Sequence, residues 1–166
     1  IQAKKELVER YQAEVRDGLR HTNAAYAAMI ESMDQTVGRI RQTLNELGIA
    51  ERTIIIFTSD NGGRIPTSSN APLRAGKGSC YEGGVRVPAI VRWTGRVPAG
   101  MVSERVTGFE DWLPTLLELA GAKEATPGEA DGVSFAPTLL GREQEPRPFL
   151  YREFATATDL FIEQGM

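Results

Sequence analysis

The sequence TIIIFTSDNGG, residues 53–63, constrains the fold of this chain more than any other stretch. Four large apolar residues at 54–57 lead into an acid, an amide and two glycines. An uninterrupted apolar run of this kind predicts a strand buried on both faces, as in the centre of a parallel sheet. We therefore expect an α/β fold in which residues 53–59 form a central strand. Ligands bind beyond the carboxyl ends of strands in open α/β sheets, where Asp60 and Asn61 would lie.

Asp60 and Asn61 allow two interpretations. Each offers a hard side-chain oxygen, and such oxygens are the ligands that Ca²⁺ and Mg²⁺ prefer. The sequence Asp-Asn-Gly-Gly is also good turn chemistry, so the same residues could simply end a strand. From these residues alone, both a metal site and a plain turn remain open.

A second motif, LRAGKGSCYEGGVRVP, occupies residues 73–88. Together with the strand motif it resembles the sulfatase family, in which FTSDNG, GKG-x-x-x-EGG-x-R-x-P and RW-x-G follow one another in this order. The resemblance extends to the helix-like residues 26–40, to DWLPTLLELAG at 111–121 and to DGVS at 131–134. It covers roughly residues 1–153.

The resemblance implies roles for three residues. Asp60 and Asn61 correspond to two of the family's Ca²⁺ ligands, and Mg²⁺ could take the place of Ca²⁺. Lys77 corresponds to the sulfate-contacting lysine, a catalytic and substrate-binding residue, and its flanking glycines would let its long side chain enter a crowded pocket. A divalent cation and a lysine can stabilise the negative charge that develops when a sulfate ester breaks. Taken in isolation, Lys77 would be a solvated loop lysine.

The resemblance also implies the architecture. We expect part of an alkaline-phosphatase-like sandwich, with a mostly parallel central sheet flanked by helices, followed by the start of a small C-terminal sheet. Residues 1–145 would be the C-terminal part of the main α/β domain. Residues 146–166 would begin the small C-terminal subdomain.

The family's nucleophile is absent from this sequence. That nucleophile is a Cys or Ser in a Cys/Ser-x-Pro-x-Arg motif, oxidised to formylglycine, and no such motif occurs in the 166 residues. Cys80 lacks the following Pro and Arg, so we expect it to be a small residue of the glycine-rich loop. The paired N-terminal metal aspartates are also missing. We therefore interpret the chain as the C-terminal portion of a sulfatase, from a truncated or artificially shortened gene, and inactive alone.

Two other functions remain open. The chain could be a non-catalytic pseudo-sulfatase, that is, a cation- or anion-binding interaction module. It could also be a phosphoryl-transfer relative from the wider superfamily, although the GKG and EGG-x-R motifs argue against this. The expected partners are a sulfate-ester substrate and either the missing N-terminal half or a second copy. The net charge of −3 gives no sign of a nucleic-acid partner.

No apolar stretch approaches the roughly 18 residues of a membrane span, and the N-terminal residues lack the apolar region of a signal peptide. The family resemblance suggests a secreted, periplasmic or lysosomal protein.

Hydrophobic spacing and turn residues predict the remaining elements. Asn23 or Thr22 should cap the long helix and Gly48 should end it, while Gly38 within it suggests close packing against a neighbour. The expected elements are helices at 4–17, 23–47 and 111–120, strands at 89–93 and 147–154, and a glycine-rich loop between the first two strands.

Four further polar residues are weaker candidates for the site. Glu82 and Arg86 belong to the second motif, and we expect them to brace the loop as a charge pair. Arg74 is expected to be a surface arginine. His21, the only histidine, does not match the family's active-site histidine, so we expect a surface or capping role.

Overall fold

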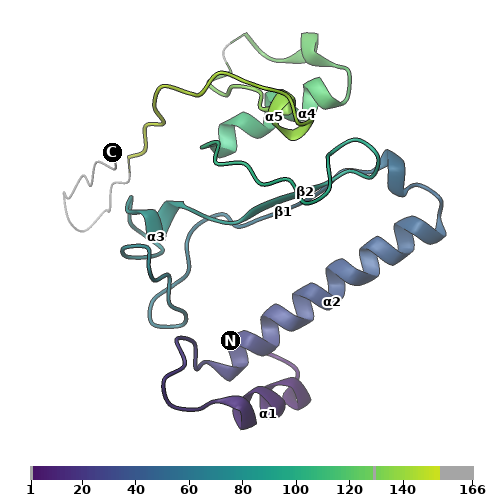
Figure 1. The fold of residues 1–166 in the computed structure, drawn as a ribbon. Coiled ribbons are helices and arrows are strands. Elements are labelled where there is room, and N and C mark those ends of the chain that lie inside the picture. The colour runs from purple at the N-terminus through teal and green to yellow at the C-terminus, as the bar shows by residue number, and fades with distance from the viewer. Residues whose placement is uncertain (1, 129, 154–166) are drawn as a thin grey trace. The chain divides into compact units, whose positions relative to one another are not determined.

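The computed structural model describes residues 2–128 and 130–153 and separates into two compact units (Figure 1). The first is formed mainly by Ile1–Thr53 and Phe57–Ile90, and the second by Ile54–Ile56 and Val91–Tyr151. The expected division near residue 145 stays a prediction. Every helix within the described residues is too short or too polar to span a membrane.

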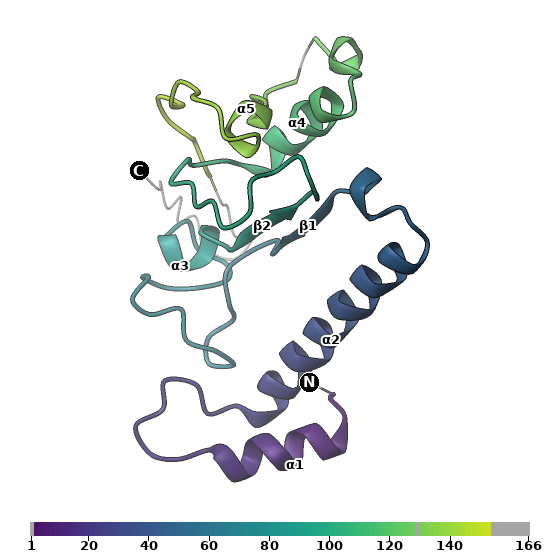
Figure 2. The ribbon, with the colours of Figure 1, turned by 45° about the vertical axis from the view of Figure 1, so that its right-hand side comes forward.

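The first unit begins with two helices, α1 (Lys5–Glu14) and α2 (Ala24–Glu46). The two pack against each other in both views (Figures 1 and 2). Leu7 of α1 and Ala24 and Ala28 of α2 are buried, and an ion pair joins Arg10 to Glu31. Small alanines on one face of α2 therefore let the two helices approach closely.

The ends of α2 follow the sequence closely. The Asn23 side chain accepts a hydrogen bond from the backbone N–H of Tyr26 at 3.0 Å, which confirms Asn23 as the cap. Gly48 follows the helix with a φ of +66°, as the C′ position requires. The expectation for Gly38 was wrong, since Gly38 is exposed and no described atom outside its own helix lies within 4 Å of a Cβ built there.

A short 3₁₀ turn, η1 (Ala50–Arg52), leads into strand β1 (Ile55–Thr58), which pairs with β2 (Ala89–Arg92). The two strands run in opposite directions (Figure 1). All four residues of β1 are half-buried, so the prediction that the strand is buried on both faces was wrong for the described chain. Within the described residues, β1 pairs with one strand only, β2. Side chains on a two-stranded sheet have few neighbours to bury them.

The second unit is helical. Its elements are η2 (Phe109–Asp111), α4 (Trp112–Leu119), η3 (Lys123–Ala125) and α5 (Ala136–Leu139), and α4 contacts the other three. Trp112 and Phe135 pack edge to face with ring centroids 4.8 Å apart. Phe135 is buried, and so are Ala136 and Thr115. The expected helix at 111–120 is confirmed, with Pro114 in its first turn and Gly121 at a φ of +74° after its end.

The strand expected at residues 147–154 is not found in its described part, 147–153. Phe149 is 79% exposed and Tyr151 is 59% exposed, so neither packs on a sheet. An extended segment forms a strand only when another strand supplies its hydrogen bonds, and the described chain offers none here. Residues 154–166, where the start of the C-terminal sheet was expected to continue, lie outside the described residues.

Candidate functional site

Asp60 and Asn61 lie just beyond the end of β1, after Ser59, as the sequence predicted. Asp60 is exposed and Asn61 is half-buried. The Asn61 side-chain nitrogen donates to an Asp60 carboxylate oxygen at 2.5 Å, and the Ser59 hydroxyl donates to the Asn61 carbonyl at 2.8 Å. These contacts hold two oxygen-bearing side chains next to each other at the carboxyl end of the strand.

Backbone hydrogen bonds join the two ends of the glycine-rich loop, residues 62–84, and tie its C-terminal end to its middle. The N–H of Gly62 donates to the Gly84 carbonyl at 2.8 Å, and the N–H of Gly83 donates to the Arg74 carbonyl at 2.7 Å. A Cβ added at Gly84 would lie 2.7 Å from the Gly76 carbonyl oxygen, and a Cβ at Gly83 would overlap the backbone of residues 74–75. Glycine is therefore required here because main-chain segments cross in contact. The loop also contains the short helix α3 (Glu82–Val85).

Asn70 holds the middle of the loop, and sequence reasoning missed it. Its side-chain oxygen accepts from the Gly63 N–H at 3.0 Å. Its side-chain nitrogen donates to the carbonyls of Gly63 at 2.8 Å and Ala75 at 3.1 Å. Both partners lie within seven residues of Asn70, but the loop has no periodicity that would have revealed these contacts.

Lys77 is placed beside the strand end by a backbone contact. Its N–H donates to the Gly63 carbonyl at 3.1 Å, and Gly63 is only two residues after Asn61. Gly76 is buried, Gly78 has a φ of +90°, and the Lys77 side chain is exposed. The loop therefore brings the backbone of Lys77 close to that of Asn61, although the two residues are sixteen positions apart in the sequence.

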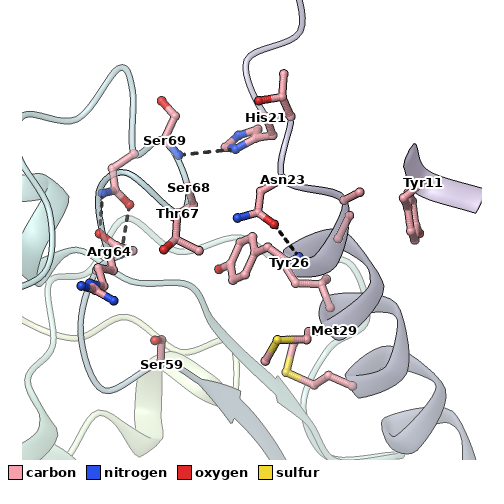
Figure 3. A pocket seen from close by; sticks show the side chains of 18 of the residues that line it. Tyr11, His21, Asn23, Tyr26, Met29, Ser59, Arg64, Thr67, Ser68 and Ser69 are labelled. Atoms are coloured by element: carbon pink, nitrogen blue, oxygen red, sulfur yellow. Dashed lines mark hydrogen bonds between the residues drawn. The ribbon is translucent and has the colours of Figure 1, made fainter. Parts of the chain in front are cut away.

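Asn61 and Lys77 line one open cavity of about 1390 Å³ in the first unit, whereas Asp60 does not. Figure 3 shows its two sides. Arg64 and Thr67 lie on the side of the glycine-rich loop, and Tyr26 and Met29 of α2 lie opposite. The cavity thus has a polar, positively charged side and an apolar, aromatic side.

The weaker candidates also have defined places. Arg86 and Glu82 form an ion pair at 3.1 Å, as expected, with both side chains more than half exposed. Such a pair adds only about 0–1 kcal/mol to stability. The Arg74 guanidinium lies 3.7 Å from the centre of the Tyr81 ring, so it braces the loop through a cation–π contact.

His21 and Cys80 also match the expectations. His21 is exposed, and its Nδ1 accepts a long hydrogen bond of 3.4 Å from the Ser69 N–H. Cys80 is 7% exposed, as a small residue packed within the loop should be.

The donor set fits part of a Ca²⁺ site. Asp60 and Asn61 supply one charged and one neutral hard oxygen from adjacent residues, whereas Ca²⁺ takes six to eight oxygens. Within residues 2–128 and 130–153, no group of three or more His, Cys, Asp or Glu side chains is placed to hold a metal. A complete site would therefore need ligands beyond these two.

Comparison with known proteins identifies the family. The sulfatase family model matches residues 2–122. A sulfatase of Formosa agariphila is 43% identical over 150 residues, which cover 84% of this chain and 27% of that protein. The N-acetylgalactosamine-6-sulfatase of Canis lupus familiaris is 38% identical, over 76% of this chain and 25% of that protein. The chain belongs to the sulfatase family.

Solved structures agree with this assignment. A crystal structure of Ps i-CgsB in complex with k-i-k-neocarrahexaose is 35% identical with a TM-score of 0.74, covering 84% of this chain and 30% of that one. The fold is therefore the α/β, alkaline-phosphatase-like fold of the sulfatases, as expected. The antiparallel pair of β1 and β2 does not test the expected parallel centre of the sheet. The chain spans about a quarter of the length of the curated relatives.

Proposed function

We propose that this chain is a portion of a sulfuric-ester hydrolase that supplies two divalent-metal ligands and a sulfate-binding lysine. The observation that supports this most is the backbone contact between Lys77 and Gly63, because it brings Lys77 beside Asn61 at one cavity. Asp60 and Asn61 would be the metal ligands. Lys77 would contact the sulfate group.

A bound Ca²⁺, or Mg²⁺ in its place, would supply electrostatic stabilisation of the charge on the sulfuryl and leaving oxygens. Asp60 and Asn61 would hold the cation, and the glycine-rich loop would fix the place of Lys77. Lys77 is suited to the task because its ammonium group is a compact point charge on a flexible stem. Its flanking Gly76 and Gly78 leave room for that stem.

The isolated chain should not turn over sulfate esters. Covalent catalysis needs an attacking group, and the Cys/Ser-x-Pro-x-Arg motif that carries formylglycine in the family is absent from the sequence. Buried Cys80 is not a substitute. We infer that activity requires the rest of a sulfatase, supplied by a complementary N-terminal segment, in a secreted, periplasmic or lysosomal setting. The alternative is a pseudo-sulfatase, an ion-binding module that never catalyses.

Binding of phenyl sulfate in the presence of Ca²⁺, followed by ligand-observed NMR, tests the proposed site. A charge-assisted hydrogen bond contributes about 1.5–3 kcal/mol, so Lys77→Ala should weaken binding at least about tenfold. Lys77→Arg should not restore it, because the planar guanidinium is wider. Ca²⁺ should bind in the millimolar range at best, and Asp60→Ala should abolish that binding.

Lys4→Ala, which removes an exposed lysine before α1, is the matched control and should bind phenyl sulfate as the unchanged chain does. Equal binding by Lys77→Ala would remove Lys77 from the proposed site. Hydrolysis of phenyl sulfate by the chain, lost in Cys80→Ala, would refute the predicted inactivity. Turnover restored by a complementary N-terminal segment would favour the hydrolase over the pseudo-sulfatase.

A further inference from the structure

The loop side of the cavity carries more positive charge than one sulfate monoester needs. Among its lining residues from 57 to 88, the charged ones are Arg64, Lys77 and Arg86, and none is acidic. Arg86 is already paired with Glu82. Within the described residues, the side chains of Arg64 and Lys77 have neither a hydrogen bond nor an ion pair. A sulfate monoester bears a single negative charge, which Lys77 alone could match.

Arg64 is held next to Lys77 by the backbone of the loop. Gly63, the residue before Arg64, accepts the N–H of Lys77 at 3.1 Å. Gly63 is itself fixed by two hydrogen bonds from the side chain of Asn70. The carbonyl of Arg64 accepts the N–H of Ser68 at 3.1 Å, which closes a turn at this point. Both cations therefore start from a fixed part of the loop and line the same cavity, and Figure 3 shows Arg64 on the loop side.

We propose that Arg64 is a specificity-determining residue that binds a second anionic group of the substrate, beside the sulfate ester at Lys77. This inference rests on the proposed function. The substrate class it defines is a sulfate ester that carries another sulfate or a carboxylate near the ester. Arginine suits either group, because its guanidinium can donate two parallel hydrogen bonds to a planar carboxylate or to sulfate oxygens.

Binding of three related saccharides to the full chain tests this proposal. The probes are N-acetylgalactosamine 6-sulfate, N-acetylgalactosamine 4,6-disulfate, and the 6-sulfate extended by a glucuronate residue. Ligand-observed NMR at constant ionic strength keeps general charge screening the same for all three. The unchanged chain should bind at least one of the two dianionic probes about tenfold more tightly than the monosulfate.

Arg64→Ala should abolish that gain and leave binding of the monosulfate unchanged. Arg86→Ala is the matched control, since it removes an arginine that lines the same cavity but is already paired, and the gain should persist. A gain with the disulfate alone identifies a second sulfate as the anion, and a gain with the glucuronate probe alone identifies a carboxylate.

The proposal is overturned if the unchanged chain shows no gain with either dianionic probe or binds none of the three. It is also overturned if the gain survives in Arg64→Ala or is lost equally in Arg86→Ala. Lys77→Ala separates this proposal from the proposed function. If that variant binds the monosulfate normally while Arg64→Ala still loses the gain, the role of Lys77 fails and the role of Arg64 stands.

Discussion

Asp111 is 2% exposed, and its carboxylate joins three segments of the second unit. It accepts hydrogen bonds from the backbone N–H groups of Gly108 and Val133, each at 2.8 Å, and from the Arg147 guanidinium at 2.7 Å. Arg147 also contacts Glu110 at 3.3 Å. A buried charge is tolerated only when it is paired and hydrogen-bonded, so each of these partners depends on the others.

Asp111→Ala should lower the free energy of unfolding by about 3–5 kcal/mol, because Arg147 loses its closer carboxylate partner and two backbone N–H groups lose their acceptor. Asp111→Asn keeps one acceptor oxygen and should lose less. Urea unfolding followed by circular dichroism measures both. Asp131→Ala removes an exposed acid of the same unit and should change little. An effect of Asp111→Ala no larger than that of Asp131→Ala would show that the carboxylate does not hold the segments together.

At the residue scale, sequence reasoning located the candidate site where its signals are local. Asp60 and Asn61 were predictable because an apolar run that stops at polar residues marks the end of a strand. Asn70 was not, because its role depends on where a loop of irregular backbone brings Gly63 and Ala75. Arg64 was missed for the same reason, since its position beside Lys77 follows from the loop's path.

At the element scale, the sequence predicted the helix boundaries to within a few residues, but it did not predict how far strand β1 is buried. Caps such as Asn23 act within one turn, so the sequence nearby contains the whole signal. The burial of β1 depends instead on how many strands surround it, and residues 53–59 carry no information on that number. The strand expected at residues 147–153 was not found for the same reason, since a strand forms only where another strand lies beside it.

Two glycines should respond to substitution in opposite ways. Gly38→Ala should stabilise the chain by about 0.5–1 kcal/mol, since Gly38 is an exposed, mid-helix residue with open space around it. Gly83→Ala should destabilise it by about 1–3 kcal/mol, because the added methyl would overlap the carbonyls of Arg74 and Ala75.

Thermal unfolding of the two variants beside the unchanged chain measures both effects. A neutral Gly83→Ala would mean that the loop can move aside, and that the crossing of its main-chain segments does not fix its path. A destabilising Gly38→Ala would mean that α2 has a neighbour at that point after all.

At the scale of the whole molecule, the apolar surface is large. Exposed large apolar side chains on and beside α2 range from 37% for Ile49 to 64% for Leu47. The described sheet has two strands, so its outer backbone edges lack strand partners within the described chain. Unpaired edges favour pairing with another chain, and each large apolar side chain contributes about 1.5–3 kcal/mol when buried.

We therefore expect the isolated chain to self-associate or to require a complementary segment. Light scattering over a wide concentration range should show a mass that rises with concentration. The double variant Ile30→Glu/Met33→Glu should reduce association, because it places charges on the exposed apolar face of α2. Asn45→Glu, at an exposed polar position of the same helix, is the control. A monomer with one cooperative thermal transition would show that the chain covers its own apolar surface.

The main-chain crossings in the glycine-rich loop have a consequence for protein engineering. Contacts at Gly62, Gly83 and Gly84 set the path of this loop, and within the described residues the side chains of Arg64 and Thr67 make no hydrogen bonds to them. These two side chains can therefore be replaced, and with them the charge presented to a ligand, while the loop keeps its course. The residues that set the course of the loop and the residues that would face a ligand are thus separate within one stretch of chain.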